Sequence, residues 1–599
     1  MSIVRAPDTG VRPDSEAADE ERPPTVGPTE AVNRSAVAGP LYRAGERCAW
    51  SLVWFGVMIG GLDLWGSWSS WPPGGYLAPL VVLIGIAGVA WTWVVADPRS
   101  PAMPLAALVS TLASTLGAEG IGIHVRQYYT TDSGAFNQVA ARLLQQGHDP
   151  YTSTMAAATQ LLNTPSDYWT YTVSGGHVTA VSYPAGSFLL EVPALLLGFH
   201  HQIVDWVDLL AWLVTGVLVF VLVPTSIRWL APLLVATPLY ADVFSSGGTD
   251  AAFLPFLVLA VWRWDRFGQA RGAGLARWVG PVALGLACSI KQTPWFCVAF
   301  IAMGLFIEAR ASGRHAVRLV VGYVAIVATV FTAVNLPFIV WQPTAWLRGT
   351  LLPIRQPLVA DGQGLVTLAL HGVARGVSLP WLSVAAGLVY LALLGALAAW
   401  YPVMKRIWLL VLPLVFFVAP RSLLSYLLDL LPAAIVAAAT VAPAPSPSRA
   451  SRPDGATRAG RWRVPVGMAA VVPAVVAVAM AVLAFASPPL QLDVRSFVSS
   501  QAATSLDAVT VEVHNSTGQT VVPHFMVTIG SSHPDGFWHT ASGRPVVLSP
   551  HDSAVVTLLP PVYAGAPTHG SYWLVAAYTS SPEALSTTPL QLWRLGKAR

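Results

Sequence analysis

Charged residues are scarce in this chain of 599 residues: Asp, Glu, Lys and Arg make up 11% of it, and hydrophobic residues make up 54%. Soluble domains carry about 25% charged residues. This composition excludes an ordinary soluble protein and predicts a polytopic membrane protein. The net charge of +4 is small, so it gives no support for nucleic-acid binding.

Cysteine is also rare, and its three copies, Cys48, Cys288 and Cys297, lie in or beside apolar segments. They suggest neither a disulfide framework nor a cluster of metal ligands. The sequence has no phosphate-binding loop of the Gly-Lys-Ser type, so ATP or a nucleotide sugar has no evident binding motif. We therefore expect neither a metal nor another cofactor.

Long apolar segments dominate the middle of the chain. Residues 1–44 are rich in Pro, Glu, Asp and Thr without an apolar period, which predicts a disordered cytoplasmic tail. Windows of about 20 residues predict about 13 transmembrane helices within residues 45–487. We place them near residues 48–66, 76–96, 103–124, 205–224, 228–243, 249–264, 278–292, 294–310, 317–338, 380–400, 407–419, 424–441 and 465–486.

The segment from Tyr183 to His201 decides the sidedness. It is short and contains Glu191 and Pro193, so we expect it to lie in the membrane interface. The basic stretches near residues 263–277, 310–318, 404–406 and 449–463 then fall on the side of the N-terminus, as the positive-inside rule requires. This predicts a plasma-membrane protein with a cytoplasmic N-terminus and extracytoplasmic loops over residues 125–204 and 339–379.

From residue 488 the pattern changes to alternation at period two, separated by Gly, Pro, Asn and Ser. This pattern predicts an extracytoplasmic β-sandwich over residues 488–599. Trp538, Tyr563 and Trp573 are candidate glycan-binding side chains, although aromatic residues of a sandwich more often belong to its core. Asn515, in an Asn-Ser-Thr sequence, is expected to form a turn rather than to carry a glycan.

A polar stretch, Tyr128 to Thr154, interrupts the apolar segments. Phe136, Val139, Ala140, Leu143 and Leu144 recur with helical spacing, while Asn137, Gln138 and Arg142 occupy the other face. We expect a helix lying on the membrane and ending at Gly147. Asp132 or Ser133 suits its N-cap, so Asp132 has both a structural and a functional interpretation. Asp149 is expected to hold the Asp-Pro-Tyr turn.

Further polar residues are predicted on the same extracytoplasmic side. They are Asp250, Lys291, Gln292, Arg355, His371, Arg421 and Tyr426. A carboxylate beside cations at an apolar interface suits transfer of a group from a lipid phosphate to a hydroxyl. The carboxylate would accept the proton of the hydroxyl, and the cations would stabilise the departing phosphate.

Several stretches resemble, in their order, the GT-C glycosyltransferases, and especially the glycosyltransferase family 87 polyprenol-phosphate-dependent mannosyl- and arabinosyltransferases of actinobacteria. Asp132 precedes "LLQQGHDPY" and "YPAGSFLLEVPALLLG", and "GLACSIKQTPW", "NLPFIVWQPTAWLRGTLLPIRQP" and "GQGLVTL" follow. The resemblance covers roughly residues 103–440. Two stretches depart from the family pattern: Tyr-Pro-Ala at 183–185 replaces Tyr-Pro-Pro, and "SSGGTD" replaces Gly-Gln-x-Asn.

The resemblance implies a GT-C-like fold, a polyprenyl-phosphate mannose or arabinofuranose donor, a glycan or glycolipid acceptor, and inversion at the anomeric carbon. It also implies that Asp132 is the catalytic base. We add the hypothesis that Lys291, Arg355 and Arg421 hold the donor phosphate. Substrate binding is assigned to Asp250, Gln292, His371 and Tyr426.

Two other functions remain open from the sequence. A transporter or flippase for a lipid-linked precursor would also have many spans with scattered cations, but its charges usually lie near the membrane centre. A non-catalytic envelope-assembly protein on a GT-C scaffold would have the same spans and β-domain. Measurement of sugar transfer distinguishes the enzyme from both.

Overall fold

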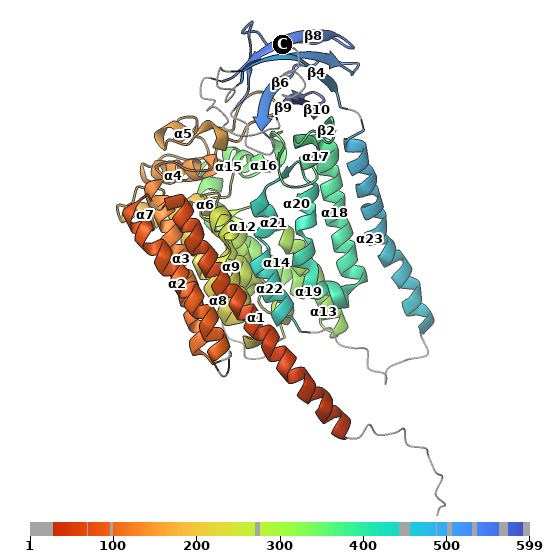
Figure 1. Cartoon of the computed structure of the whole chain (residues 1–599). Coiled ribbons are helices and arrows are strands. Elements are labelled where there is room, and N and C mark those ends of the chain that lie inside the picture. The colour runs from red at the N-terminus through yellow and green to blue at the C-terminus, as the bar shows by residue number, and fades with distance from the viewer. Residues whose placement is uncertain are drawn as a thin grey trace, which may run out of the picture.

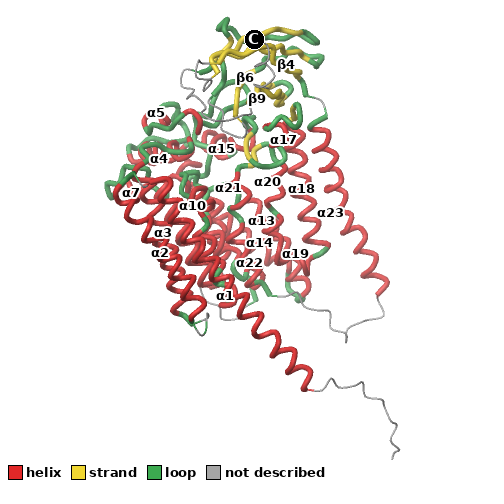
Figure 2. The backbone as a smooth tube through the Cα atoms, in the orientation of Figure 1, coloured by secondary structure: helices red, strands yellow, loops and turns green. Residues whose placement is uncertain are grey.

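The chain is mostly helical, with its strands gathered at one end (Figure 1). The computed structural model describes residues 28–68, 70–95, 97, 100–269, 276–442, 456–486, 488–499, 506–529, 536–561 and 573–590. The tube view separates the bundle of helices from the sheet region above it (Figure 2).

Seven helices in the described part of the chain are long and apolar enough to cross a membrane. An α-helix needs about 20 apolar residues to cross about 30 Å of hydrocarbon. The seven are α1 (Pro28–Trp68), α2 (Pro72–Val94), α3 (Ala102–Val125), α8 (Ile203–Leu222), α14 (Ala316–Trp341), α18 (Leu379–Ala399) and α23 (Ala456–Ala484). In α1 and α23, the candidate spans are residues 42–68 and 467–484. The chain is therefore a membrane-embedded protein.

The other predicted spans correspond to shorter helices: α9 (Leu230–Ala236), α10 (Pro238–Phe244), α11 (Leu254–Val261), α12 (Ala276–Ile290), α13 (Trp295–Ala311), α19 (Tyr401–Val411), α20 (Pro413–Val418), α21 (Leu424–Leu428) and α22 (Leu431–Thr440). Several breaks coincide with a proline in the first turn of the next helix, as at Pro238, Pro413 and Pro432. Proline lacks the N–H that would continue the preceding helix. The total of 13 spans stays a prediction.

The shorter helices pack with α8, α14 and α18 in the largest buried core of the described part of the chain. Trp212, Phe253, Phe300 and Trp408 are among its fully buried side chains, and they come from α8, the turn before α11, α13 and α19. Packing in this core fixes the positions of the helix ends. Those helix ends carry polar side chains.

The N-terminal boundary differs from the prediction. Helix α1 begins at Pro28, so the segment predicted as disordered over residues 1–44 is helical from that point. Ala, Arg and Glu favour helix and recur before the apolar part of α1, so the span extends in the N-terminal direction. Residues 1–27 lie outside the described residues.

A layer of short helices lies between the membrane helices and the sheets (Figure 1). It consists of α4 (Asp132–Gln145), α5 (Ala158–Leu161), η1 (Ser166–Tyr168), α6 (Gly186–Leu189), α7 (Val192–Leu196), α15 (Pro343–Thr350), α16 (Leu352–Arg355) and α17 (Thr367–Leu370); two further one-turn helices, η2 (Thr225–Ile227) and η3 (Trp264–Arg266), follow α8 and α11. Together α6 and α7 occupy residues 186–196, a length of about 16 Å, which is too short to cross a bilayer.

Helix α4 departs in part from its predicted exposure. Asn137 and Gln138, assigned to the polar face, are 1% and 0% exposed. Gln138 accepts hydrogen bonds from the Tyr129 hydroxyl and from the backbone N–H of Ile203, and it donates to the His200 carbonyl. These polar residues are buried because α4 packs against α7 and α8 on the side that the periodicity assigned to solvent.

The end of α4 agrees with the prediction. Gly147 has a φ of +80°, its N–H donates to Leu144, and the N–H of His148 donates to Leu143, which is the Schellman pattern. Asp149 accepts a hydrogen bond from the backbone N–H of Tyr151, so it holds the Asp-Pro-Tyr turn as expected.

Two four-stranded sheets form the end of the molecule. One has the order β4 (Leu490–Ser499), β5 (Leu506–Asn515), β8 (Ser553–Leu559) and β7 (His539–Thr540); the other has the order β2 (Gly376–Ser378), β10 (Glu583–Leu590), β9 (Trp573–Ser580) and β6 (His524–Ile529). Side chains of both sheets share one buried core, including Val511 and Val575. The β-sandwich stays a prediction, and the second sheet contains a strand, β2, from the loop that precedes α18.

Candidate functional site

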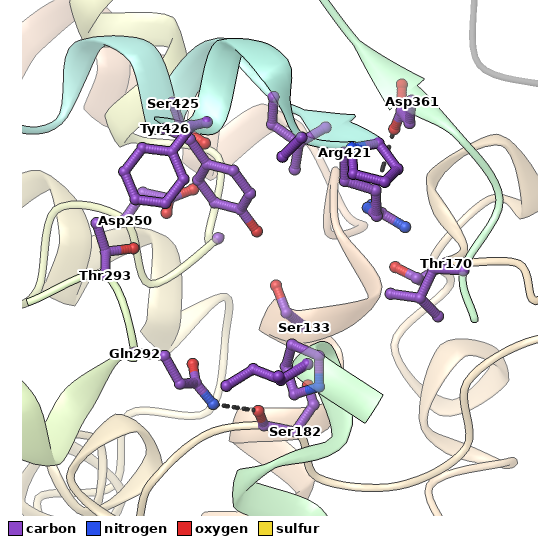
Figure 3. Close-up of a pocket in the computed structure, with 18 of the residues that line it drawn as sticks. Ser133, Thr170, Ser182, Asp250, Gln292, Thr293, Asp361, Arg421, Ser425 and Tyr426 are labelled. Carbon is purple, nitrogen blue, oxygen red and sulfur yellow. Dashed lines mark hydrogen bonds and ion pairs between the residues drawn. The ribbon is translucent and has the colours of Figure 1, made fainter. Parts of the chain in front are cut away.

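A cavity of about 1150 Å³ lies where the short helices at the sheet end of the molecule meet the membrane helices. Its wall includes Asp132, Asp250, Lys291, Gln292, Arg355, Arg421 and Tyr426, all predicted as site residues. Figure 3 shows Thr170, Asp361 and Arg421 on one side of this cavity and Asp250, Thr293 and Tyr426 on the other. Segments far apart in the sequence therefore bring these predicted residues together.

Asp132 lies in the first turn of α4 but does not cap it. The N-cap is Thr131, whose Oγ1 accepts a hydrogen bond from the Gly134 N–H at 3.1 Å, so the proposed capping role of Asp132 or Ser133 is wrong. Asp132 is 6% exposed and accepts two hydrogen bonds from Thr170, one from the backbone N–H at 2.7 Å and one from Oγ1 at 3.1 Å.

The surroundings of Asp132 make it a stronger base than an exposed aspartate. Burial raises the pKa of its carboxyl, while the two Thr170 hydrogen bonds and then the Arg421 charge act to lower it. A general base works best when its pKa approaches the pH of the reaction. The site therefore combines a raised pKa with a fixed carboxylate orientation.

Thr170 is held by the loop that contains it. The neighbouring Val173 donates its N–H to the Pro357 carbonyl at 3.2 Å, and Val359 donates to the Tyr171 carbonyl at 3.0 Å. These bonds join the Thr170 segment to the segment that directly follows α16. Thr170, which holds Asp132, and Arg355, the last residue of α16, are thus positioned by one set of backbone contacts.

Asp250 and Lys291 form a buried ion pair. The Lys291 ammonium also donates to the Gly248 carbonyl at 3.1 Å and lies 5.4 Å and 5.3 Å from the ring centroids of Tyr183 and Tyr426. Lysine and aspartate were predicted to bind different parts of the substrate, but they bind each other. The charge of Lys291 is therefore largely balanced within the protein.

The loop before α11 supports this pair. Gly247 and Thr249 have positive φ angles of 70° and 56°, which allow a tight turn directly beneath Asp250. Asp208 in α8 accepts hydrogen bonds from the Thr249 and Ala252 N–H groups at 2.8 and 3.0 Å. Thr131 donates from Oγ1 to the Gly247 carbonyl at 3.0 Å, so the same loop also contacts the start of α4.

Gln292 joins two segments of the wall. Its Nε2 donates to the Ser182 carbonyl at 2.9 Å (Figure 3) and to the Thr350 carbonyl at 2.8 Å. Both amide hydrogens are therefore used within the protein. A substrate would be left with the side-chain carbonyl as its hydrogen-bonding partner.

The two arginines differ in their surroundings. Arg421 lies 3.7 Å from Asp361 across the parallel pair β1 (Asp361–Gly362) and β3 (Arg421–Ser422), and both side chains are about a fifth exposed. The Arg355 side chain is exposed and makes no hydrogen bond or ion pair within the described part of the chain. Arg355 is thus the cation of the wall whose charge is not matched by any described residue.

His371 is not among the residues that line the cavity, so the structure does not bring it together with the other predicted site residues. It follows α17, and its backbone N–H closes the last turn of that helix by donating to the Thr367 carbonyl at 2.9 Å. The short helix α17 and strand β2 turn this part of the loop toward the sheets. The sequence pattern of the loop does not predict that turn.

Sequence reasoning missed Thr170, Asp361 and Glu583 in the cavity wall. Thr170 lies 38 residues from Asp132 in an irregular loop, so no periodicity connects them. Glu583 lies in the C-terminal sheet region. One signal could have identified the segment that contains Thr170. Residues 166–170, Ser-Asp-Tyr-Trp-Thr, all have side chains that can form hydrogen bonds.

Two of the three aromatic residues considered for glycan binding, Trp538 and Trp573, belong to the core of the C-terminal region. Trp538 and Trp573 are 7% and 6% exposed, so their rings are not available as binding surfaces. Tyr563 lies outside the described residues. Asn515 is buried, and its Oδ1 accepts hydrogen bonds from the N–H and hydroxyl of Thr517, which confirms the turn expected there.

No protein-family model, no curated protein and no solved structure matches this chain.

Proposed function

We propose that the chain is a GT-C-like membrane glycosyltransferase that uses a polyprenyl-phosphate sugar, mannose or arabinofuranose, as its donor. The acceptor is a glycan or glycolipid on the extracytoplasmic face of the plasma membrane. The observation that supports this proposal is one cavity whose wall contains a buried carboxylate, three cations and apolar side chains of membrane helices.

The carboxylate is suited to the proton transfer. Asp132 accepts the proton of an acceptor hydroxyl while the hydroxyl oxygen attacks the anomeric carbon of the donor. The bond from that carbon to the phosphate oxygen breaks, and the oxygen leaves with the electron pair. A single displacement of this kind inverts the anomeric configuration. The raised pKa of Asp132 favours proton acceptance near neutral pH.

The cations are suited to the departing phosphate. Arg355 is unmatched within the described chain, and Arg421 has a partly exposed partner 3.7 Å away. A guanidinium can bind a phosphate through two parallel hydrogen bonds. Lys291, already paired with Asp250, supports the electrostatics of the wall more than it contacts the donor.

Apolar side chains account for the lipid. Phe296 of α13, Val384 and Tyr390 of α18, and Phe416 of α20 line the same cavity. A polyprenyl chain requires an apolar surface that continues from the membrane to the phosphate. Walls made of membrane helices satisfy that requirement.

Transfer is tested with the full chain in nanodiscs that contain radiolabelled polyprenyl-phosphate mannose or polyprenyl-phosphate arabinofuranose and a mixture of neutral oligosaccharide acceptors. We expect label to move into the acceptor with one donor. Asp132→Asn should reduce the rate by about 10²- to 10⁴-fold, the usual contribution of general acid-base catalysis.

Asp507→Asn is the matched control, because Asp507 is an exposed aspartate of β5 outside the cavity. Undiminished transfer by Asp132→Asn would contradict the assigned role. Binding of donor lipid without transfer by the wild-type chain would favour the non-catalytic assembly protein, and movement of the intact lipid across the bilayer would favour the flippase.

A further inference from the structure

The C-terminal sheet forms part of the cavity wall through Glu583. Glu583 is the first residue of β10, and the next residue, Ala584, is paired with Ser378 of β2. Strand β2 runs directly into α18, whose second residue, Pro380, also lines the cavity. The strand register therefore fixes Glu583 beside the membrane helices that form the apolar wall.

The contact between the sheet and the external loops is a packed core. Buried side chains from three parts of the chain meet there, among them Tyr171, Val377 and Leu585. The Tyr578 hydroxyl donates to the Ala360 carbonyl at 3.4 Å, and the Tyr171 ring meets the edge of Phe537 with centroids 5.6 Å apart. Glu583 is thus held against the cavity by a well-packed interface.

The carboxylate of Glu583 makes no hydrogen bond or ion pair within the described part of the chain. Its side chain is half-buried, and this burial raises the pKa of its carboxyl. A partly desolvated carboxylate without a partner is costly, and a hydroxyl donor would relieve that cost. Sugars supply such donors in pairs on neighbouring carbons.

Aromatic side chains lie in the wall beside the base. Tyr168 and Trp169 are half-buried and directly precede Thr170, which holds Asp132. The Trp169 ring is fixed by a bond from Nε1 to the Thr164 carbonyl at 3.0 Å and by its packing against His177 at 4.8 Å. A few fixed rings with convergent polar groups are the usual surface for a small polar ligand.

The charges of the wall distinguish between classes of acceptor. Five carboxylates line the cavity against three cations, which leaves two carboxylates in excess. Asp250 and Asp361 are matched by Lys291 and Arg421, and a donor phosphate would match Arg355. An acceptor with its own negative charge would enter an already negative site, and like charges in contact disfavour binding.

We propose that Glu583, together with Tyr168 and Trp169, forms the acceptor subsite, and that the acceptor is an uncharged glycan. This inference rests on the proposed function, because it takes the same cavity to be the place of sugar transfer. It assigns the C-terminal sheet a direct contact with substrate through a residue at its edge, in place of the buried tryptophans.

The test measures acceptor binding apart from transfer. Full-length Asp132→Asn in nanodiscs that contain polyprenyl phosphate, which supplies the phosphate that matches Arg355, is titrated with mannotriose, with an arabinofuranose trisaccharide and with trigalacturonate. Binding is followed by intrinsic tryptophan fluorescence. We expect one neutral trisaccharide to bind at least about tenfold more tightly than trigalacturonate, as expected for one unfavourable charge contact. In the same background, Glu583→Gln should weaken neutral binding about 5- to 20-fold, because the amide oxygen of Gln still accepts the hydrogen bond but without the negative charge that strengthens it.

Two further variants test whether the charge of residue 583 sets the preference between neutral and charged trisaccharides. Glu583→Lys should reverse the preference toward trigalacturonate, whereas Asp507→Asn should change neither affinity. Thermal unfolding of each variant confirms that the sheets remain folded. The comparison of neutral and charged trisaccharides needs no substitution at Glu583. Equal affinity for neutral and charged trisaccharides, no binding of either neutral trisaccharide, or unchanged neutral binding in Glu583→Gln would overturn the inference.

Failure of the proposed function is recognised separately. It would appear as absence of binding of polyprenyl phosphate to the wild-type chain and absence of transfer from either donor. Retained donor binding and transfer with an acceptor that ignores Glu583 would reject the subsite alone.

Discussion

The hydroxyl of Thr170 sets part of the basicity of Asp132. Thr170→Val keeps the side-chain shape and the backbone N–H bond at 2.7 Å but removes the Oγ1 bond at 3.1 Å. Because Asp132 is 6% exposed, water has little access to replace the lost donor. A hydrogen bond to a charged group contributes about 1.5–3 kcal/mol, and only the ionised carboxylate gains it fully.

The direction of the effect follows from the state in which the base acts. Loss of the bond raises the pKa of Asp132, so less of the carboxyl is ionised on the acid side of the pH profile. The loss of about 1.5–3 kcal/mol corresponds there to a kcat/KM lower by about 10- to 150-fold. At alkaline pH, where both proteins carry the ionised carboxylate, the two rates should approach each other.

The assay is the pH dependence of kcat/KM for sugar transfer in nanodiscs. Thr170→Ser, which keeps a hydroxyl, should retain most of the wild-type profile. Thr172→Val is the matched control, since its hydroxyl bonds to Ser174 at 3.0 Å and not to Asp132. An active Thr170→Val protein whose acid limb coincides with the wild-type limb would refute the reasoning.

Three other variants test separate parts of the structure. Asp250→Asn should lower the thermal unfolding midpoint, since breaking a buried ion pair costs about 3–5 kcal/mol, and the added substitution Lys291→Met should restore much of it; a double variant no more stable than the single one would argue against the pair. Arg355→Gln should weaken binding of polyprenyl phosphate about tenfold, measured by titration, with an unchanged unfolding midpoint; unchanged affinity would remove Arg355 from the phosphate site. Trp573→Ala should destabilise the sheets by about 3–5 kcal/mol, seen as faster amide exchange in β6 and β9; loss of oligosaccharide binding with unchanged exchange would contradict its position in the core.

The features that the sequence predicts well are those set by neighbouring residues. The long apolar helices follow from local composition, and Gly147 ends α4 because a left-handed residue there suits glycine. The gathering of Asp132, Lys291 and Arg421 around one cavity also agrees with their predicted common side. A shared membrane face restricts distant polar residues to a thin layer, which makes their meeting easier to anticipate.

Features set by packing between distant segments could not be predicted in this way. Gln138 is buried because α8 covers the polar side of α4, although the helical period assigned that side to solvent. Ser378 belongs to a strand that completes a sheet made from residues about two hundred positions later. His371 leaves the cavity for the same reason, because the chain around it turns toward that sheet.

The pairing of the cations is the feature of the site's electrostatics that differs most from the prediction made from the sequence. The sequence assigns Lys291 and Arg421 the same role, as cations that hold a phosphate. In the structure, their carboxylate partners differ in exposure. The Lys291 pair is buried, so exchanging Asp250 for a phosphate would leave an uncompensated buried carboxylate. The Arg421 pair is about a fifth exposed with its atoms 3.7 Å apart, so its attraction is weak and Asp361 can remain hydrated when it is released. Under the proposed function, a donor phosphate can therefore recruit Arg421 alongside Arg355 at small cost, whereas Lys291 stays paired with Asp250.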